Sequence, residues 1–116
     1  MRIEELKLYQ LAMEIAEEIW EIVKTWDHFA KDTIGKQLVR SADGIASNIS
    51  EGFGRYHYKE SKLFYYYARG SLYETRTWIT KACNRGLLQS ERFLILKDKL
   101  AHTNALLNNY IKTVGP

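Results

Sequence analysis

The sequence predicts an all-α protein that folds as an antiparallel, up-down four-helix bundle. Apolar residues recur at helical spacing in four separate stretches, and no stretch alternates apolar and polar residues as a strand would. The only proline is Pro116, at the end of the chain, so no proline interrupts a helix. Four helices of about twenty residues with short links favour antiparallel bundle packing.

Each predicted helix follows one apolar row and is bounded by residues typical of helix ends. The helices are expected at roughly Glu5 to Trp26, Thr33 to Gly52, Lys59 to Arg85 and Ser90 to Val114. Asp32 is predicted to cap the second helix and Ser90 the fourth, because their side chains can accept hydrogen bonds from free backbone amides. Gly52 and Gly54 are predicted to end the second helix, and Gly86 the third, by adopting positive φ.

Length and composition indicate a single globular domain over residues 1–116, with 46% hydrophobic residues. No apolar run approaches the roughly 20 residues of a membrane span, and the N-terminal residues lack the apolar core of a secretion signal. Cys83 is the only cysteine, which excludes an internal disulfide and is typical of a reducing cytosol. We therefore expect a cytoplasmic protein without membrane association. The net charge of +3 permits nucleic-acid binding without requiring it.

The sequence lacks the residue patterns of an enzyme, a metal centre or a cofactor site. His28, His57 and His102 are far apart, and none belongs to a Glu-x-x-His or His-x-x-x-His pair of the kind that binds metals on helices. Cys83 has no histidine near it in sequence and is expected to be a buried thiol. No glycine-rich stretch ends in the lysine and serine or threonine of a phosphate loop. We expect no catalytic residue, no metal and no cofactor.

The first helix has a second apolar row beside its core row. This row consists of Tyr9, Met13, Ala16, Trp20 and Val23. It either widens the buried face of a core helix or forms a subunit interface, where large aromatic residues are enriched.

Four polar residues border the apolar rows of the second and third helices. Asn48 and Glu51 lie on the second helix, and Ser71 and Glu74 hold comparable positions on the third. Hydrogen bonds among them would fix the register of the two helices, because an unpaired buried polar group costs about 1–3 kcal/mol. The alternative is a small-molecule site near Asn48 and Glu51.

The third helix carries a stripe of alternating cations and aromatic rings, turned away from its core row. Positive charge continues into the preceding turn. Cations neutralise phosphates and rings stack on bases, so this pattern suits RNA or DNA. A solvated face whose arginines lie over neighbouring tyrosines would give the same pattern. The residues concerned are Lys62, Tyr66, Arg69, Tyr73 and Arg76 in the stripe, with Arg55 and Lys59 in the turn.

Two segments resemble a known bacterial family. QLVRSADGIASNISEGFGR, residues 37–55, contains the pattern Asn-Ile-x-Glu-Gly-x-Gly-Arg, and KESKLFYYYARGSLYETRTWITKA, residues 59–82, contains Ala-Arg-Gly-Ser-Leu-x-Glu. With the opening LYQLAMEIAEEIW, nearly the whole chain resembles the four-helix-bundle proteins encoded in intervening sequences of bacterial large-subunit ribosomal RNA genes. The family often has Phe-Pro in the link after the first helix, where this chain has Phe29-Ala30.

The resemblance implies an up-down bundle that assembles into a homo-oligomeric ring, commonly a pentamer, with a basic channel or face. Related bundles are accessory proteins that bind nucleic acid and a reverse transcriptase in diversity-generating retroelements. We therefore expect a non-enzymatic homo-oligomer that binds RNA or DNA, with phosphates contacted by the arginines and lysines named above and bases stacked on Tyr66 and Tyr73. The alternative is a protein-interaction scaffold or an accessory subunit for a partner enzyme such as a reverse transcriptase.

Overall fold

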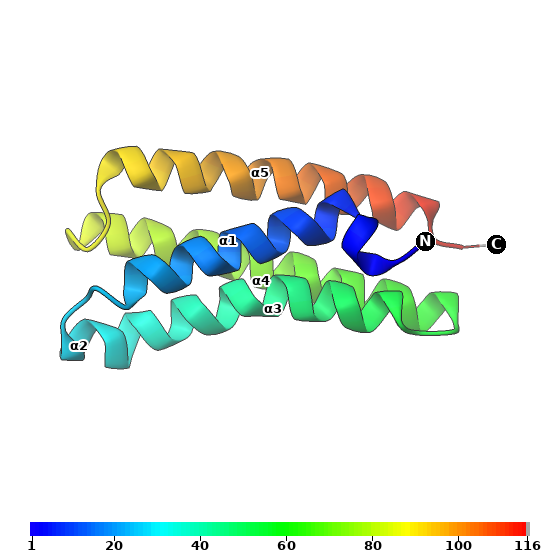
Figure 1. Cartoon of the computed structure of the whole chain (residues 1–116), viewed down its shortest axis with the longest axis horizontal. Helices are drawn as coiled ribbons and strands as arrows, with labels where there is room; N and C mark the ends of the chain where they lie inside the picture. Colours follow the sequence, from blue (N-terminus) through cyan, green and yellow to red (C-terminus); the bar gives the residue numbers. More distant parts are fainter. Residues whose placement is uncertain (116) are drawn as a thin grey trace.

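The computed structural model describes residues 1–115, and Pro116 lies outside the described residues. Within this range the long helices are α1 (Lys7–Val23), α3 (Lys36–Phe53), α4 (Tyr58–Asn84) and α5 (Ser90–Thr113). The 3-10 turn η1 (Ile3–Glu5) precedes α1, and α2 (His28–Ala30) and the π-helical turn η2 (Lys31–Gly35) lead directly into α3. Successive long helices run in opposite directions, and the N-terminus and the end of α5 lie at the same end of the bundle (Figure 1). The predicted up-down four-helix bundle is confirmed.

One hydrophobic core runs along the axis of the bundle, and all four long helices contribute to it. The α4 residues in this core differ partly from those predicted. Helical spacing in this segment predicts a core row of Phe64, Ala68, Ser71, Thr75, Ile79 and Ala82. In the structure Tyr65 and Leu72, each 2% exposed, are buried in place of Phe64 and Ser71. Three consecutive tyrosines obscure the apolar period in this part of α4, so the sequence places the core face one residue too early. No helix within residues 1–115 is both long and apolar enough to cross a bilayer.

The second apolar row of α1 is divided between the core and the surface. Ala16 and Val23 are buried against the rest of the bundle, and Tyr9 is half-buried. Met13 and Trp20 remain 41% and 53% exposed, respectively. Burial in the bundle therefore accounts for Ala16, Val23 and part of Tyr9, but not for Met13 and Trp20.

The second predicted helix begins earlier than expected, because Asp27 caps it instead of Asp32. Asp27 Oδ1 accepts a hydrogen bond from the backbone N–H of Ala30 at 2.9 Å, so helical structure starts at His28. The predicted Asp32 cap is wrong: Asp32 lies inside η2, where its carboxylate is 2.8 Å from Lys36 Nζ. The hydrogen bond and charge of Lys36 hold the pKa of Asp32 below its ordinary value.

Gly86 ends α4 by the predicted mechanism. Its φ is +75°, and the backbone N–H of Leu87 donates to the Ala82 carbonyl oxygen at 2.9 Å, which closes the helix end. The predicted Ser90 cap is wrong. Ser90 is itself the first residue of α5, and the N-cap position belongs to Gln89, whose side chain makes no capping hydrogen bond.

The glycines at the end of α3 act by close packing instead of by positive φ. The helix stops where predicted, with Gly54 at the C-cap, but Gly54 has φ −82° and Gly52 is a buried helical residue. The predicted positive φ is therefore wrong. A Cβ added at Gly52 would lie 2.6 Å from Tyr65 Cε1 and 3.0 Å from the Ser61 carbonyl oxygen. The missing side chain lets α4 approach α3 at this point.

The substitution Gly52→Ala is expected to destabilise the protein by about 1–3 kcal/mol, because the added methyl overpacks against Tyr65. The measurement is the midpoint of urea unfolding. Gly70→Ala is the matched control, since Gly70 is exposed on α4 and an added Cβ has no neighbour within 4 Å. This control is expected to stabilise the protein by about 0.5–1 kcal/mol through helix propensity. Equal shifts for the two variants would contradict the packing role of Gly52.

Candidate nucleic-acid interface

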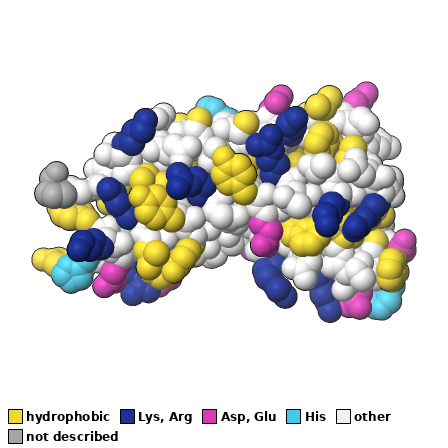
Figure 2. Space-filling model, turned by 180° about the vertical axis from the view of Figure 1, so that it is seen from behind, with side chains coloured by type: hydrophobic (Ala, Val, Ile, Leu, Met, Phe, Trp, Pro, Cys, Tyr) yellow, Lys and Arg dark blue, Asp and Glu magenta, His cyan; other side chains and the backbone are white. Residues whose placement is uncertain are grey.

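The predicted basic stripe runs along α4 beside α5. α4 packs against α3 and α5. It lies behind α1 and α3 in Figure 1. Seen from that rear side, the surface carries Lys and Arg side chains interleaved with hydrophobic ones, a class that includes tyrosine (Figure 2). We call Lys62, Tyr66, Arg69, Tyr73 and Arg76 the α4 stripe.

The α4 stripe is open to solvent at its rings and held in place at its centre. Tyr66 and Tyr73 are 44% and 49% exposed, and Arg76 is exposed. Arg69 is half-buried: its Nη1 donates to Asn108 Oδ1 at 2.9 Å, and its Cζ lies 5.1 Å from the centroid of the Tyr66 ring. Within residues 1–115, neither arginine has a carboxylate oxygen within 4 Å. Their positive charges are therefore uncompensated by ion pairs in this range.

Of the two cations predicted in the turn before α4, Arg55 lies in that turn and Lys59 lies in the first turn of α4, and their surroundings differ. Arg55 Nη2 lies 2.6 Å from Glu51 Oε1, its Nη1 lies 3.7 Å from Glu60 Oε2, and its guanidinium covers the Phe64 ring at 4.8 Å. Lys59 is exposed and has no carboxylate within 4 Å in the described part of the chain. Two neighbouring carboxylates offset the charge of Arg55. The cations of the α4 stripe and of the start of α4 that have no carboxylate within 4 Å in residues 1–115 are Lys59, Lys62, Arg69 and Arg76.

Residues of α5 that the sequence analysis did not single out complete this surface. Asn108 orients Arg69, and Asn104 Nδ2 donates to the Tyr73 hydroxyl at 3.5 Å. Asn104 Oδ1 is buried and has no hydrogen-bond partner among residues 1–115. Asparagines four residues apart inside a helix are unfavourable helix formers, and this signal could have drawn attention to them. A groove of about 170 Å³ lies beside them, and its polar residues are Tyr73, Arg76, Lys97, Asp98 and Asn104.

The four predicted polar residues do not form one network. Asn48 Nδ2 donates to the Gly44 carbonyl oxygen at 2.9 Å and lies 3.5 Å from Ser71 Oγ, so the structure brings these two predicted residues together. Glu51 forms an ion pair with Arg55. Glu74 is exposed on α4 and makes no hydrogen bond to the described side chains. Asn48 thus contacts both α3 and α4. Its amide N–H groups are already engaged by these contacts.

A second polar contact between α3 and α4 lies deeper in the bundle. The Thr75 hydroxyl lies 2.9 Å from Ser41 Oγ and 2.8 Å from the Ser71 carbonyl oxygen, and it can donate to either. Thr75 is 0% exposed and Ser41 is 3% exposed. Thr75 lies in the core row that helical spacing predicts, whereas Ser41, which precedes Ala42 at the same buried face, was not predicted from the sequence. These contacts specify the register of α3 against α4, and therefore the direction in which the α4 stripe points.

The substitution Thr75→Val is expected to destabilise the protein by about 0.5–1.5 kcal/mol, because it removes a buried hydrogen bond without changing the side-chain shape much. Thr80→Val is the matched control: Thr80 is also on α4 and also donates to the carbonyl oxygen four residues back, but it is exposed. Its effect is expected to stay within about 0.5 kcal/mol. Urea unfolding of both variants measures the difference. Equal losses would mean that the contact with Ser41 adds nothing.

Comparisons with known proteins agree with this bundle. The sequence matches the family described as "23S rRNA-intervening sequence protein" over residues 4–109. A solved protein of unknown function from the S23 ribosomal protein family of Bacteroides thetaiotaomicron has the same fold, with a TM-score of 0.82 and 22% identity. That similarity covers 91% of this chain and 99% of the other. Comparison with curated proteins finds no match. Because the family match spans nearly the whole chain, the protein belongs to the 23S rRNA-intervening sequence protein family.

Proposed function

We propose that this protein is a non-enzymatic, cytoplasmic homo-oligomer that binds RNA or DNA through the α4 stripe. The observation that carries the proposal is the alternation, on one side of α4, of exposed tyrosine rings with cations that have no carboxylate within 4 Å in residues 1–115. Tyr66 and Tyr73 are seven residues apart, which is about 10.5 Å along the helix axis. Arg69 lies between them and Arg76 beyond them, so a strand laid along α4 meets rings and charges in turn.

The hydrogen bond between Arg69 and Asn108 preorganises the guanidinium for binding a phosphate. Asn108 already holds the guanidinium in place, so less side-chain entropy is lost when a phosphate arrives. Contacts to phosphates and to ring faces do not read base edges, and the proposed binding therefore has little sequence preference.

The family assignment supports RNA as the nucleic acid, because the family is described by its connection to 23S rRNA. The net charge of only +3 per chain is a reason to include oligomerisation in the proposal. A symmetric ring, commonly a pentamer in the proteins this chain resembles, would repeat the stripe and strengthen its field. Mass measurement in solution tests the oligomer, and a monomer at working concentration would remove this part of the proposal.

A protein-interaction scaffold is the second candidate function. The exposed Met13 and Trp20, on α1 and away from the stripe, favour it, since solvent-exposed aromatic and methionine side chains are enriched at protein interfaces. It predicts that a partner enzyme stays bound after nuclease treatment and at high salt. Loss of the partner under either condition would contradict it.

The double substitution Arg69→Glu and Arg76→Glu is expected to weaken binding of a fluorescent single-stranded RNA at low salt by at least about tenfold. Each reversal removes a phosphate contact and adds a repulsive charge. Helical content measured by circular dichroism is expected to stay unchanged, because Arg76 is exposed and the half-buried Arg69 lies outside the hydrophobic core.

The control for this experiment is the pair Arg2→Glu and Lys7→Glu, which changes the net charge by the same amount at an exposed site outside the stripe. It is expected to keep RNA affinity within about twofold, since its residues contact no phosphate in the proposed arrangement. If both double variants lose affinity equally, net charge alone drives binding and the α4 stripe is not the site.

A further inference from the structure

A groove on the other side of the bundle has the size and lining of a small-molecule site. It lies between α1 and the η2–α3 segment and has a volume of about 430 Å³. Small-molecule sites commonly enclose about 300–1,000 Å³ and are mostly apolar with a few placed polar groups. The apolar walls of the groove are Trp20, Val23 and Val39.

Gly35 lines the groove where η2 passes close to α1. A Cβ at this position would lie 2.9 Å from Val23 Cγ1 and 3.0 Å from the Ala30 carbonyl oxygen. The close approach of the η2 backbone to Val23 therefore requires that this residue has no side chain.

All charged residues that line the groove are cations. Two of them are paired with carboxylates at the surface: Lys24 Nζ lies 3.0 Å from Glu21 and Lys36 Nζ lies 2.8 Å from Asp32. The groove therefore keeps an excess of positive charge that suits a ligand with one or two negative charges. The lining cations without a carboxylate within 4 Å in residues 1–115 are Lys31 and Arg40.

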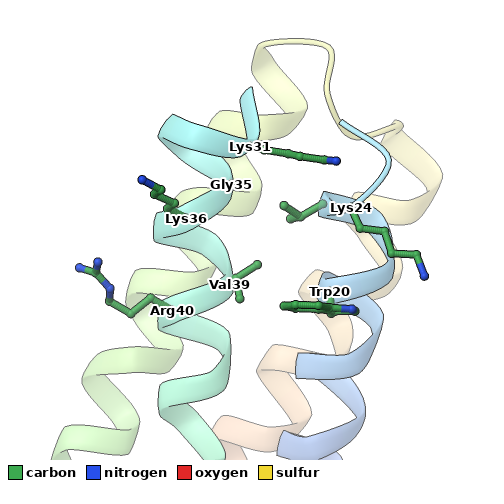
Figure 3. Close-up of a pocket in the computed structure, with 8 residues that line it drawn as sticks. Trp20, Lys24, Lys31, Gly35, Lys36, Val39 and Arg40 are labelled. Atoms are coloured by element: carbon green, nitrogen blue, oxygen red, sulfur yellow. The ribbon is translucent and has the colours of Figure 1, made fainter. Parts of the chain in front are cut away.

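Trp20 and Lys31 enter the groove from two different elements, α1 and η2. The indole of Trp20 points from α1 toward Val39 of α3, and Lys31 extends from η2 across the groove on the side of one ring face (Figure 3). Trp20 is 53% exposed, so its ring is accessible without moving the core. Arg40 points to the outer side of α3 and contributes its field at the rim (Figure 3).

We propose that this groove binds a free, planar aromatic anion of the chemical class of nucleoside monophosphates. The base stacks on Trp20, and the phosphate meets Lys31. None of the lining side chains has a hydrogen-bond acceptor, so no side chain of the groove accepts a hydrogen bond from the amino group of a base. The site is separate from the α4 stripe and does not depend on the nucleic-acid function proposed above.

Titration with 5′-AMP tests the proposal, followed through the indole N–H signals in a ¹H–¹⁵N NMR spectrum. The signal of Trp20 is expected to shift saturably while that of Trp78, on α4, stays in place. Adenosine and inorganic phosphate are each expected to bind at least about tenfold more weakly, because each supplies only one half of the interaction. An unshifted Trp20 signal at millimolar AMP, or equal binding of inorganic phosphate, would overturn the proposal.

Two substitutions test the contributions of the Trp20 ring and of the Lys31 charge separately. Trp20→Leu is expected to weaken AMP binding by about tenfold or more, since it removes the stacking partner. Lys31→Met keeps an aliphatic stem and loses the charge, and it is expected to weaken AMP binding while leaving adenosine binding unchanged. Lys81→Gln is the matched control: its ammonium lies 5.2 Å from the Trp78 ring on α4, outside the groove. AMP affinity that survives Trp20→Leu, or falls equally in the control, contradicts the site.

Two further outcomes distinguish other occupants. The Arg69→Glu, Arg76→Glu variant is expected to bind AMP normally even where it loses RNA, which separates this groove from the stripe. If that variant shows the Trp20 shift with a single-stranded oligonucleotide but not with AMP, a strand occupies the groove and the proposal is wrong. If Trp20→Leu changes the mass in solution and AMP does not bind, the groove is a subunit contact and the proposal is wrong.

Discussion

The close contact between α3 and α4 is the constraint on which the rest of the structure depends. Gly44 and Gly52 carry no side chain where Ser71 and Tyr65 of α4 pass, and any Cβ there would lie within 3 Å of them. The contact fixes the rotation of α4. Since residues facing α3 and the core are buried, helical geometry turns the intervening arginines and tyrosines to the outside. The basic surface is thus a consequence of how tightly two helices pack.

The bundle was predictable because its main cause, helical apolar periodicity, is local in the sequence. The ends of helices were less predictable, because several residues compete for each cap. Asp27 and Asp32 both have capping side chains, and the choice depends on where the chain leaves α1 and on the extra residue in the π-helical turn η2. In the sequence, Gly52 is compatible either with a helix end or with the close approach of a second helix. The position of Tyr65 on α4 shows that the close approach is the reason for the glycine.

The candidate site was predictable to the extent that it lies on one helix. The α4 stripe follows from spacing alone, and the Arg55–Glu51 pair could also have been anticipated from its separation of four residues. Contacts between helices could not be predicted from residue spacing within one helix. Asn104 and Asn108 meet α4 because of the rotation of α5, and the groove at Trp20 combines α1 with a turn that the sequence analysis did not foresee.

The salt dependence of RNA binding by the unaltered protein tests the central claim most directly. Lys59, Lys62, Arg69 and Arg76 are the cations of the α4 stripe and of the start of α4 that no carboxylate approaches within 4 Å in residues 1–115. If each neutralises one phosphate of a single strand, log K is expected to fall with log salt concentration with a slope of about −3 per protomer. A slope near zero would contradict the account, because the surface that α3 packing directs outward would then not be meeting phosphates.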